Sequence, residues 1–215
     1  TEKSIGITGF EDGRLKFPQS IAMKGEPSAF DIADIDGDGK LDCAYIGKDV
    51  NDVRFFEVIP NTTLSSNGNN PSSAVIPLLR LKTNPDGIKL FDVNSDGLCD
   101  ALILVQWELP VLLLQGPSGK FTEVSPDASQ MSLLKDAVLR GLSTARLGQE
   151  REHLLVAQKN FARSLDFDSS GKWRIVDQFN AKSSDNTISA AAAFDIDNDG
   201  EAELLLLDSS RGQLQ

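Results

Sequence analysis

The sequence predicts an all-β fold, a β-propeller of four-stranded blades, and three observations lead to this prediction. The first is a nine-residue acidic pattern that occurs three times along the 215 residues, at 34–42, 92–100 and 195–203. The second is the short apolar run that follows each copy, such as Ala101–Val105, which is typical of a buried strand. The third is the spacing of Asp42, Asp100, His153 and Glu203, which lie 58, 53 and 50 residues apart, near the period of the longer propeller blades.

Each acidic pattern has the ligand spacing of a calcium loop, and we name the copies loop one, loop two and loop three in chain order. Side-chain oxygens at positions 1, 3, 5 and 9 and the backbone carbonyl at position 7 suit a hard cation, and the glycine at position 6 permits the sharp turn. We therefore expect about three bound Ca²⁺ ions. Their expected ligands are Asp34, Asp36, Asp38, Lys40 and Asp42 in loop one, Asp92, Asn94, Asp96, Leu98 and Asp100 in loop two, and Asp195, Asp197, Asp199, Glu201 and Glu203 in loop three.

An EF-hand is the main alternative for such loops, and the sequence argues against it. An EF-hand loop needs a bidentate glutamate at position 12 and a helix on either side. Position 12 is Tyr45, Ile103 and Leu206 in the three copies, and the residues that follow each loop read as strands. Each loop is therefore expected in a hairpin, between strands 1 and 2 of a blade.

The remaining elements follow from alternating apolar runs separated by turn residues. Strands are expected at 4–9, 14–23, 28–35, 42–48, 53–60, 74–82, 88–93, 101–107, 110–115, 121–124, 141–146, 153–159, 161–167, 173–179 and on both sides of loop three from 188. The polar stretch 61–73 is expected as a surface loop. The connector 126–140 has Met131, Leu134 and Val138 at helical spacing, so it is either a short helix or an irregular link.

These elements divide a single domain, 1–215, into approximate units. The units are 1–27 (a partial blade), 28–87, 88–140, 141–187 and 188–215 (a partial blade). Two arrangements are compatible with this division. The two partial blades can complete one shared blade and close a four-bladed ring, or the chain is part of a larger propeller. We favour the second, because both ends are cut within a unit and the first residue is Thr1 rather than Met.

The charge of the chain is explained by its loops. Of the 32 acidic residues, 11 occupy ligand positions in the three loops, and the other 21 equal the 21 basic residues in number. A nucleic-acid partner is not expected, because it requires a basic surface. No apolar run reaches the 18 residues of a membrane span, so no membrane insertion is expected in this segment.

A few residues invite separate predictions. The third unit lacks the acidic pattern at 145–153, where Ala145, Leu147 and Gln149 cannot act as ligands and His153 stands at position 9, expected as a half-buried polar residue. Cys43 and Cys99 should face the same side of their own blades and remain free thiols. Trp107 and Trp173 are expected in strands, packed between blades. Asn61-Thr62-Thr63 matches a glycosylation sequon, a short pattern with many false matches.

The loop pattern D-x-[DN]-x-D-G-x-x-[DE], at 34–42, 92–100 and 195–203, resembles the FG-GAP/VCBS repeats. These are calcium-loop propeller blades found in integrin alpha-subunit heads and in large bacterial surface proteins. Since the Phe-Gly and Gly-Ala-Pro signatures of integrins are not visible, the bacterial VCBS style is the closer match. The resemblance implies an extracellular, cell-surface or periplasmic setting and no particular activity.

Two functions from different classes follow. The first is a non-catalytic, calcium-binding interaction or adhesion module for an extracellular protein or glycan whose identity the sequence does not give. The second is the propeller domain of a carbohydrate-active enzyme, a polysaccharide lyase or hydrolase. We favour the first, because an enzyme needs convergent titratable groups in a pocket, and few remain once the loop carboxylates are assigned. No catalytic residue is predicted.

Overall fold

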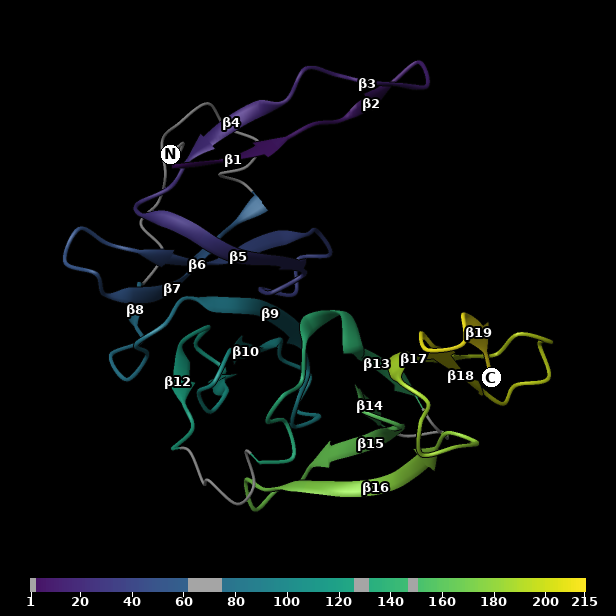
Figure 1. Cartoon of the computed structure of the whole chain (residues 1–215). Coiled ribbons are helices and arrows are strands. Elements are labelled where there is room, and N and C mark those ends of the chain that lie inside the picture. Colours follow the sequence, from purple (N-terminus) through teal and green to yellow (C-terminus); the bar gives the residue numbers. More distant parts are fainter. Residues whose placement is uncertain (1–2, 62–74, 126–131, 147–150) are drawn as a thin grey trace.

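The computed structural model describes residues 3–61, 75–125, 132–146 and 151–215 (Figure 1). Antiparallel strands dominate these residues, so the all-β prediction is confirmed. The predicted surface loop 61–73 falls outside the described residues except for Asn61.

Three sheets have four antiparallel strands each, in simple sequential order, as predicted. Sheet one contains β5 (Glu26–Ala33), β6 (Asp42–Lys48), β7 (Arg54–Ile59) and β8 (Ile76–Pro77). Sheet two contains β9 (Pro85–Phe91), β10 (Asp100–Val105), β11 (Val111–Gln115) and β12 (Phe121–Glu123). Sheet three contains β13 (Leu142–Arg146), β14 (Glu152–Gln158), β15 (Phe161–Phe167) and β16 (Trp173–Asn180).

Smaller sheets stand at the two ends of the described chain. Sheet four contains β17 (Ile188–Phe194), β18 (Glu203–Asp208) and β19 (Gln213–Leu214). The N-terminal sheet pairs β1 (Ser4–Ile7) with β4 (Gln19–Ala22), and its tip forms a second small hairpin of β2 (Phe10–Glu11) and β3 (Arg14–Leu15). The strand predicted at 14–23 is thus interrupted, and the strand predicted at 4–9 ends at Ile7.

The sheets pack face to face in chain order, from the N-terminal sheet to sheet four (Figure 1). Alternation of side chains across a strand explains this order. In β10, Ala101 and Ile103 join the apolar core against sheet one, whereas Leu102 and Leu104 join the core against sheet three. All six residues of β10 are buried. A strand buried on both faces requires a continuous apolar run, which is the pattern that identified it in the sequence.

Of the two alternatives for the connection 126–140, the described residues show the irregular link. Residues 126–131 lie outside the described part, and 132–138 form turns followed by a short 3₁₀ helix, η1 (Leu139–Gly141). Asp136 has a φ of 69°, and this left-handed conformation interrupts an α-helix. The alternative of a short α-helix is therefore wrong for the described residues. Leu134 is nonetheless 1% exposed and anchors the segment in the core between sheets two and three.

The strand predicted at 74–82 is also shorter in the structure. Only Ile76 and Pro77 pair with β7. Proline has no N–H to continue a ladder, and the chain turns at once, with the Leu81 N–H donating to the Leu78 carbonyl at 3.1 Å. Both leucines are buried. The apolar run predicted as one strand is thus a short edge strand followed by two leucines that pack in the core.

The four-bladed ring closed by a shared terminal blade is not formed. Within the described residues β1 pairs with β4 and β19 pairs with β18, in separate sheets. Figure 1 shows the N-terminal and C-terminal sheets well apart. Trp173 packs in the core between sheets two and three, as predicted, but Trp107 is 86% exposed in the turn after β10, so its predicted packing is wrong.

Candidate metal centre

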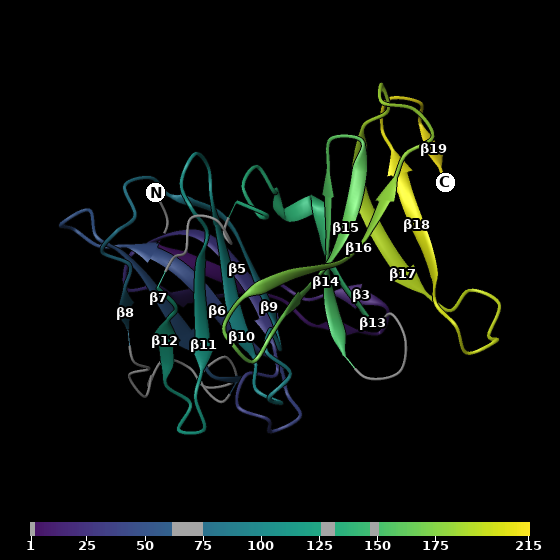
Figure 2. The ribbon, with the colours of Figure 1, turned by 90° about the horizontal axis from the view of Figure 1, so that it is seen from below.

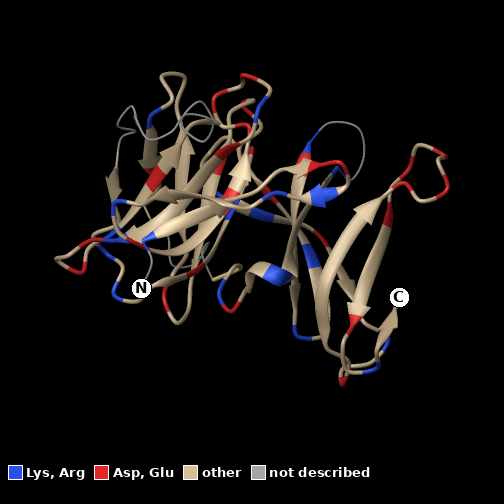
Figure 3. Ribbon diagram, turned by 90° about the horizontal axis from the view of Figure 1, so that it is seen from above, with Lys and Arg blue, Asp and Glu red and all other residues tan. Residues whose placement is uncertain are grey.

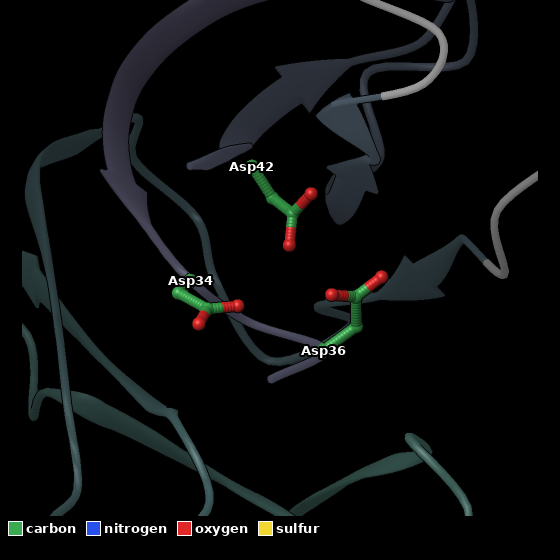
Figure 4. A group of neighbouring side chains, drawn as sticks. All are labelled: Asp34, Asp36 and Asp42. Atoms are coloured by element: carbon green, nitrogen blue, oxygen red, sulfur yellow. The ribbon is translucent and has the colours of Figure 1, made fainter. Parts of the chain in front are cut away.

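Loop one connects β5 to β6 and brings three of its expected ligands together. One carboxylate oxygen from each of Asp34, Asp36 and Asp42 lies within 4.8 Å of the others, and Figure 4 shows the three groups pointing toward a shared space. Asp38 is turned aside and accepts a hydrogen bond from Asn61 Nδ2 at 3.0 Å, which lowers its pKa. The three oxygens have the chemistry that Ca²⁺ requires.

The backbone wraps around the carboxylate at position 1. In loop one, the N–H groups of Gly37 and Gly39 donate to the two oxygens of Asp34, both at 2.9 Å. The glycine at position 6 has a positive φ in every copy, 82° for Gly39, 84° for Gly97 and 92° for Gly200. Because other residues rarely adopt this conformation, the glycine is needed for the turn itself.

The position-9 carboxylates tie the loops to their sheets. Asp42 is 1% exposed and accepts N–H groups from Ile35 at 3.0 Å and Asn61 at 2.7 Å. Asp100 is fully buried and accepts the corresponding groups of Val93 at 3.0 Å and Gln115 at 2.8 Å. The two loops are therefore built alike.

Loop two has one carboxylate fewer than the others because Asn94 occupies position 3. The Asn94 Oδ1 atom accepts the Asp96 N–H at 3.1 Å, as a carboxylate would, and its Nδ2 donates to Asp96 Oδ2 at 3.0 Å. Asp92 accepts the Gly97 N–H at 2.9 Å. The position-6 contact of loop one is thus preserved, but among the described residues the acidic side chains brought within 4.8 Å of one another are those of loops one and three.

Loop three repeats the pattern in a more exposed place. One oxygen from each of Asp195, Asp197 and Asp199 lies within 4.8 Å of the others, and all three residues are exposed. Glu203 stands outside this group, yet its Oε2 accepts the Ile196 N–H at 2.8 Å, the bond that Asp42 makes to Ile35. Figure 3 shows the acidic hairpin between β17 and β18 projecting from the rest of the chain, and Figure 2 shows the loops after β5, β9 and β17 on the same side.

The position-7 residues have the same role in all three loops. Lys40, Leu98 and Glu201 each donate their N–H to the carboxylate at position 5, at 2.9, 2.9 and 2.8 Å. This bond fixes the peptide next to the carbonyl that the spacing predicts as a ligand.

Burial raises the pKa of Asp100 to about 6, against the opposing effect of the N–H groups of Gln115 and Val93. The neighbouring carboxylates of Asp96 and Asp92 raise it further. A buried carboxylate held beside other carboxylates favours either a proton or a metal cation.

Two residues that support the loops were not predicted to do so from the sequence. Gln115 ends the third strand of sheet two and Asn61 follows the third strand of sheet one, and each donates its backbone N–H to the position-9 aspartate. The Gln115 side chain also donates to the Ile35 carbonyl at 3.1 Å, which links loop one to sheet two. A hydrogen bond donated by a backbone N–H cannot be recognised from the sequence, because every residue except proline has this group. Asn61 is 8% exposed with its amide bonded, which argues against glycan attachment there.

The third unit replaces the acidic pattern with other polar contacts. His153 Nδ1 lies 2.8 Å from the hydroxyl of the fully buried Ser164. Asp166, 6% exposed, pairs with Arg174 at 2.8 Å and with Arg151 at 3.9 Å. The prediction of a half-buried polar His153 is confirmed.

Cys43 and Cys99 are free thiols, as predicted. Cys43 packs against the N-terminal sheet and Cys99 against sheet one, so each faces the preceding sheet. Burial raises their thiol pKa values to about 11 and about 12. Both are therefore protonated and poorly nucleophilic at neutral pH.

Comparison with known protein families and with curated proteins finds no match to this chain. Among the described residues, no helix has the length and apolar character to cross a membrane.

Proposed function

We propose that this chain is a calcium-stabilised, propeller-type interaction module of the FG-GAP/VCBS kind, which binds an extracellular protein or glycan. The observation that carries the metal part of the proposal is the repeated loop. In each loop the N–H of the position-6 glycine donates to the position-1 carboxylate, that of Asp34, Asp92 or Asp195, at 2.9 Å. A structure repeated at equivalent points of three sheets argues for a shared requirement, and Ca²⁺ meets it with oxygen ligands.

The propeller part of the proposal is supported by the sheets. Consecutive four-stranded antiparallel sheets pack face to face, each through an apolar core with the next. The metal loops join the first and second strands of sheets one, two and four. This is the arrangement expected of blades around an axis.

The calcium requirement suggests where the module works. Extracellular calcium modules bind with dissociation constants of roughly 10⁻⁴ to 10⁻³ M. Sites of this class fill only where calcium is millimolar, so we propose the cell surface, the medium or the periplasm.

The experiment is a calorimetric calcium titration combined with thermal melting in calcium and in chelator. We expect a stoichiometry near three. Calcium at about ten times its dissociation constant should stabilise the fold by roughly 1.4 kcal/mol per site. Absence of calcium uptake, or melting curves that coincide in calcium and chelator, would refute the metal part of the proposal.

The carbohydrate-active enzyme receives no support from the described residues. Its general base would have to come from the chain's single histidine or from carboxylates outside the loops. His153 is half-buried, and its Nδ1 atom is engaged by the hydroxyl of the buried Ser164. We therefore propose the interaction module alone.

A further inference from the structure

A cavity of about 710 Å³ lies between sheets one and two. Its size falls within the range of roughly 300–1,000 Å³ that small-molecule sites occupy. The edge strands β8 and β12 run side by side at this place in both views (Figures 1 and 2). The wall is mainly apolar and comes from both sheets: Ile35, Phe56, Val58, Ile76, Pro77 and Phe121.

Part of the cavity wall is buried and packed, whereas Pro77 is exposed and Val58 and Ile76 are half-buried. The rings of Phe56 and Phe121 meet edge to face, with centroids 5.0 Å apart, and are 1% and 6% exposed. Gln115 lines the cavity and joins the two sheets through its bond to the Ile35 carbonyl. Because the wall is already ordered, a ligand would not have to organise it on binding.

Three charged residues also line the cavity. Asp36 and Asp42 belong to loop one, and Lys120 follows the turn after β11. Among the residues that the structure describes, no carboxylate lies within ion-pair distance of the Lys120 ammonium, which is exposed. A free cation beside an apolar cavity favours a ligand with an anionic end.

We propose that this cavity binds a small amphipathic carboxylate, with its aryl or alkyl body against Phe56 and Phe121 and its carboxylate toward Lys120 and the cation of loop one. The dependence on calcium rests on the proposed function. Without metal, Asp36 and Asp42 repel the ligand's carboxylate. With Ca²⁺ in loop one, two of the loop's four carboxylate charges are neutralised, which weakens this repulsion, and the ion itself attracts the ligand's carboxylate. Calcium and ligand should therefore strengthen each other's binding.

The experiment uses 4-phenylbutyrate as the probe and 4-phenyl-1-butanol, which has the same body without the charge, as the control. Binding of both is followed by NMR and calorimetry in calcium and in chelator. We expect the carboxylate to bind several-fold more tightly in calcium and the alcohol to bind equally in both. Lys120→Gln should weaken the binding of the carboxylate probe by about two- to fivefold, as for an exposed ion pair, and leave the binding of the alcohol unchanged.

Ile76→Trp on the edge strand should fill the cavity and abolish binding of both probes, while a calcium titration of the same variant shows whether it remains folded. Equal binding of both probes with no effect of Lys120→Gln would overturn the carboxylate assignment. Normal calcium uptake without binding of either probe would overturn the cavity proposal and leave the proposed function intact. Probe binding that persists without any calcium uptake would support the cavity and refute the metal site.

Discussion

Sheets two and three have the same strand order, but they stabilise the polar groups near the loop between their first two strands by different means. Sheet two buries Asp100, whose charge has no cationic side chain among its hydrogen-bond partners in the described chain. Sheet three places His153 at the same position, bonded to Ser164, and carries its own cation in Arg151, at the position-7 place of the lost loop, near Asp166. The difference teaches that the four-stranded sheet does not itself require a metal. In sheet three the side chains of Arg151 and Arg174 balance the buried carboxylate of Asp166, whereas for sheet two we propose that an ion from solution does so for Asp100.

The largest effect should come from Asp100→Ala measured in calcium. The change removes the acceptor of two buried N–H groups, those of Val93 and Gln115, and also a predicted metal ligand. Each unsatisfied buried donor costs about 1–3 kcal/mol, so we expect a loss of about 4 kcal/mol in the free energy of unfolding. Urea denaturation measures it. Asp86→Ala, an exposed position on β9, is the control and should change stability by less than about 0.5 kcal/mol. A loss under about 1 kcal/mol for Asp100→Ala would contradict the buried role.

The second effect concerns pH in the absence of metal. The pKa of Asp100 is about 6 in the folded chain and about 3.9 in an unfolded one. Because folding raises this pKa, the stabilising contribution is complete below pH 4 and is lost as pH rises through 6. In chelator the free energy of unfolding should therefore fall by roughly 2 kcal/mol between pH 4 and 7 on account of this group.

Other carboxylates titrate in the opposite direction, so the measurement compares the wild type with Asp100→Asn across this pH range in chelator. The free energy of unfolding of the wild type minus that of Asp100→Asn should decrease with rising pH. In calcium the trend should disappear, since the cation keeps the carboxylate ionised. Parallel curves in chelator would show that Asp100 does not titrate as proposed.

A smaller effect is expected for His153→Ala in sheet three. The change leaves the buried hydroxyl of Ser164 without its partner at 2.8 Å. We expect a loss of about 1–2 kcal/mol in the free energy of unfolding, equal in calcium and in chelator. Measuring Asp100→Ala under both conditions provides the contrast. A loss for His153→Ala that depends on calcium would break the comparison between the two sheets.

The smallest effect on stability should follow from Asp197→Ala in loop three. Its carboxylate is exposed and accepts one N–H, that of Asp199, at 3.2 Å. Stability in chelator should change by less than about 1 kcal/mol. The calorimetric stoichiometry for calcium should nonetheless fall by one. An unchanged stoichiometry would exclude loop three from the metal sites.

The sequence predicted those parts of the fold that local pattern controls. β6 and β15 occur at the predicted residues, because an apolar run between polar turns has one way to be buried in a sheet. The hairpin loops were predicted because carboxylate spacing and a left-handed glycine are visible in the chain.

Contacts between distant segments could not be predicted in this way. Gln115 reaches the Ile35 carbonyl 80 positions away, and only the packing of two sheets brings them together. Asp136 ended the expected helix through its own backbone conformation, which the spacing of Leu134 and Val138 does not reveal. The metal ligands remain predictions, since the same carboxylate oxygens also accept hydrogen bonds from backbone N–H groups of the loops.

The packing of each sheet on its neighbours in the chain gives the molecule a preferred order of opening. β10 has every residue buried and a core on each side, whereas β18 has one core and exposes Leu207 at 40%. In such a row, a terminal sheet can detach and leave the others assembled, but a middle sheet cannot. Native-state hydrogen exchange should therefore be slowest in β10 and progressively faster toward β1 and β18, because the outer sheets open before the middle ones.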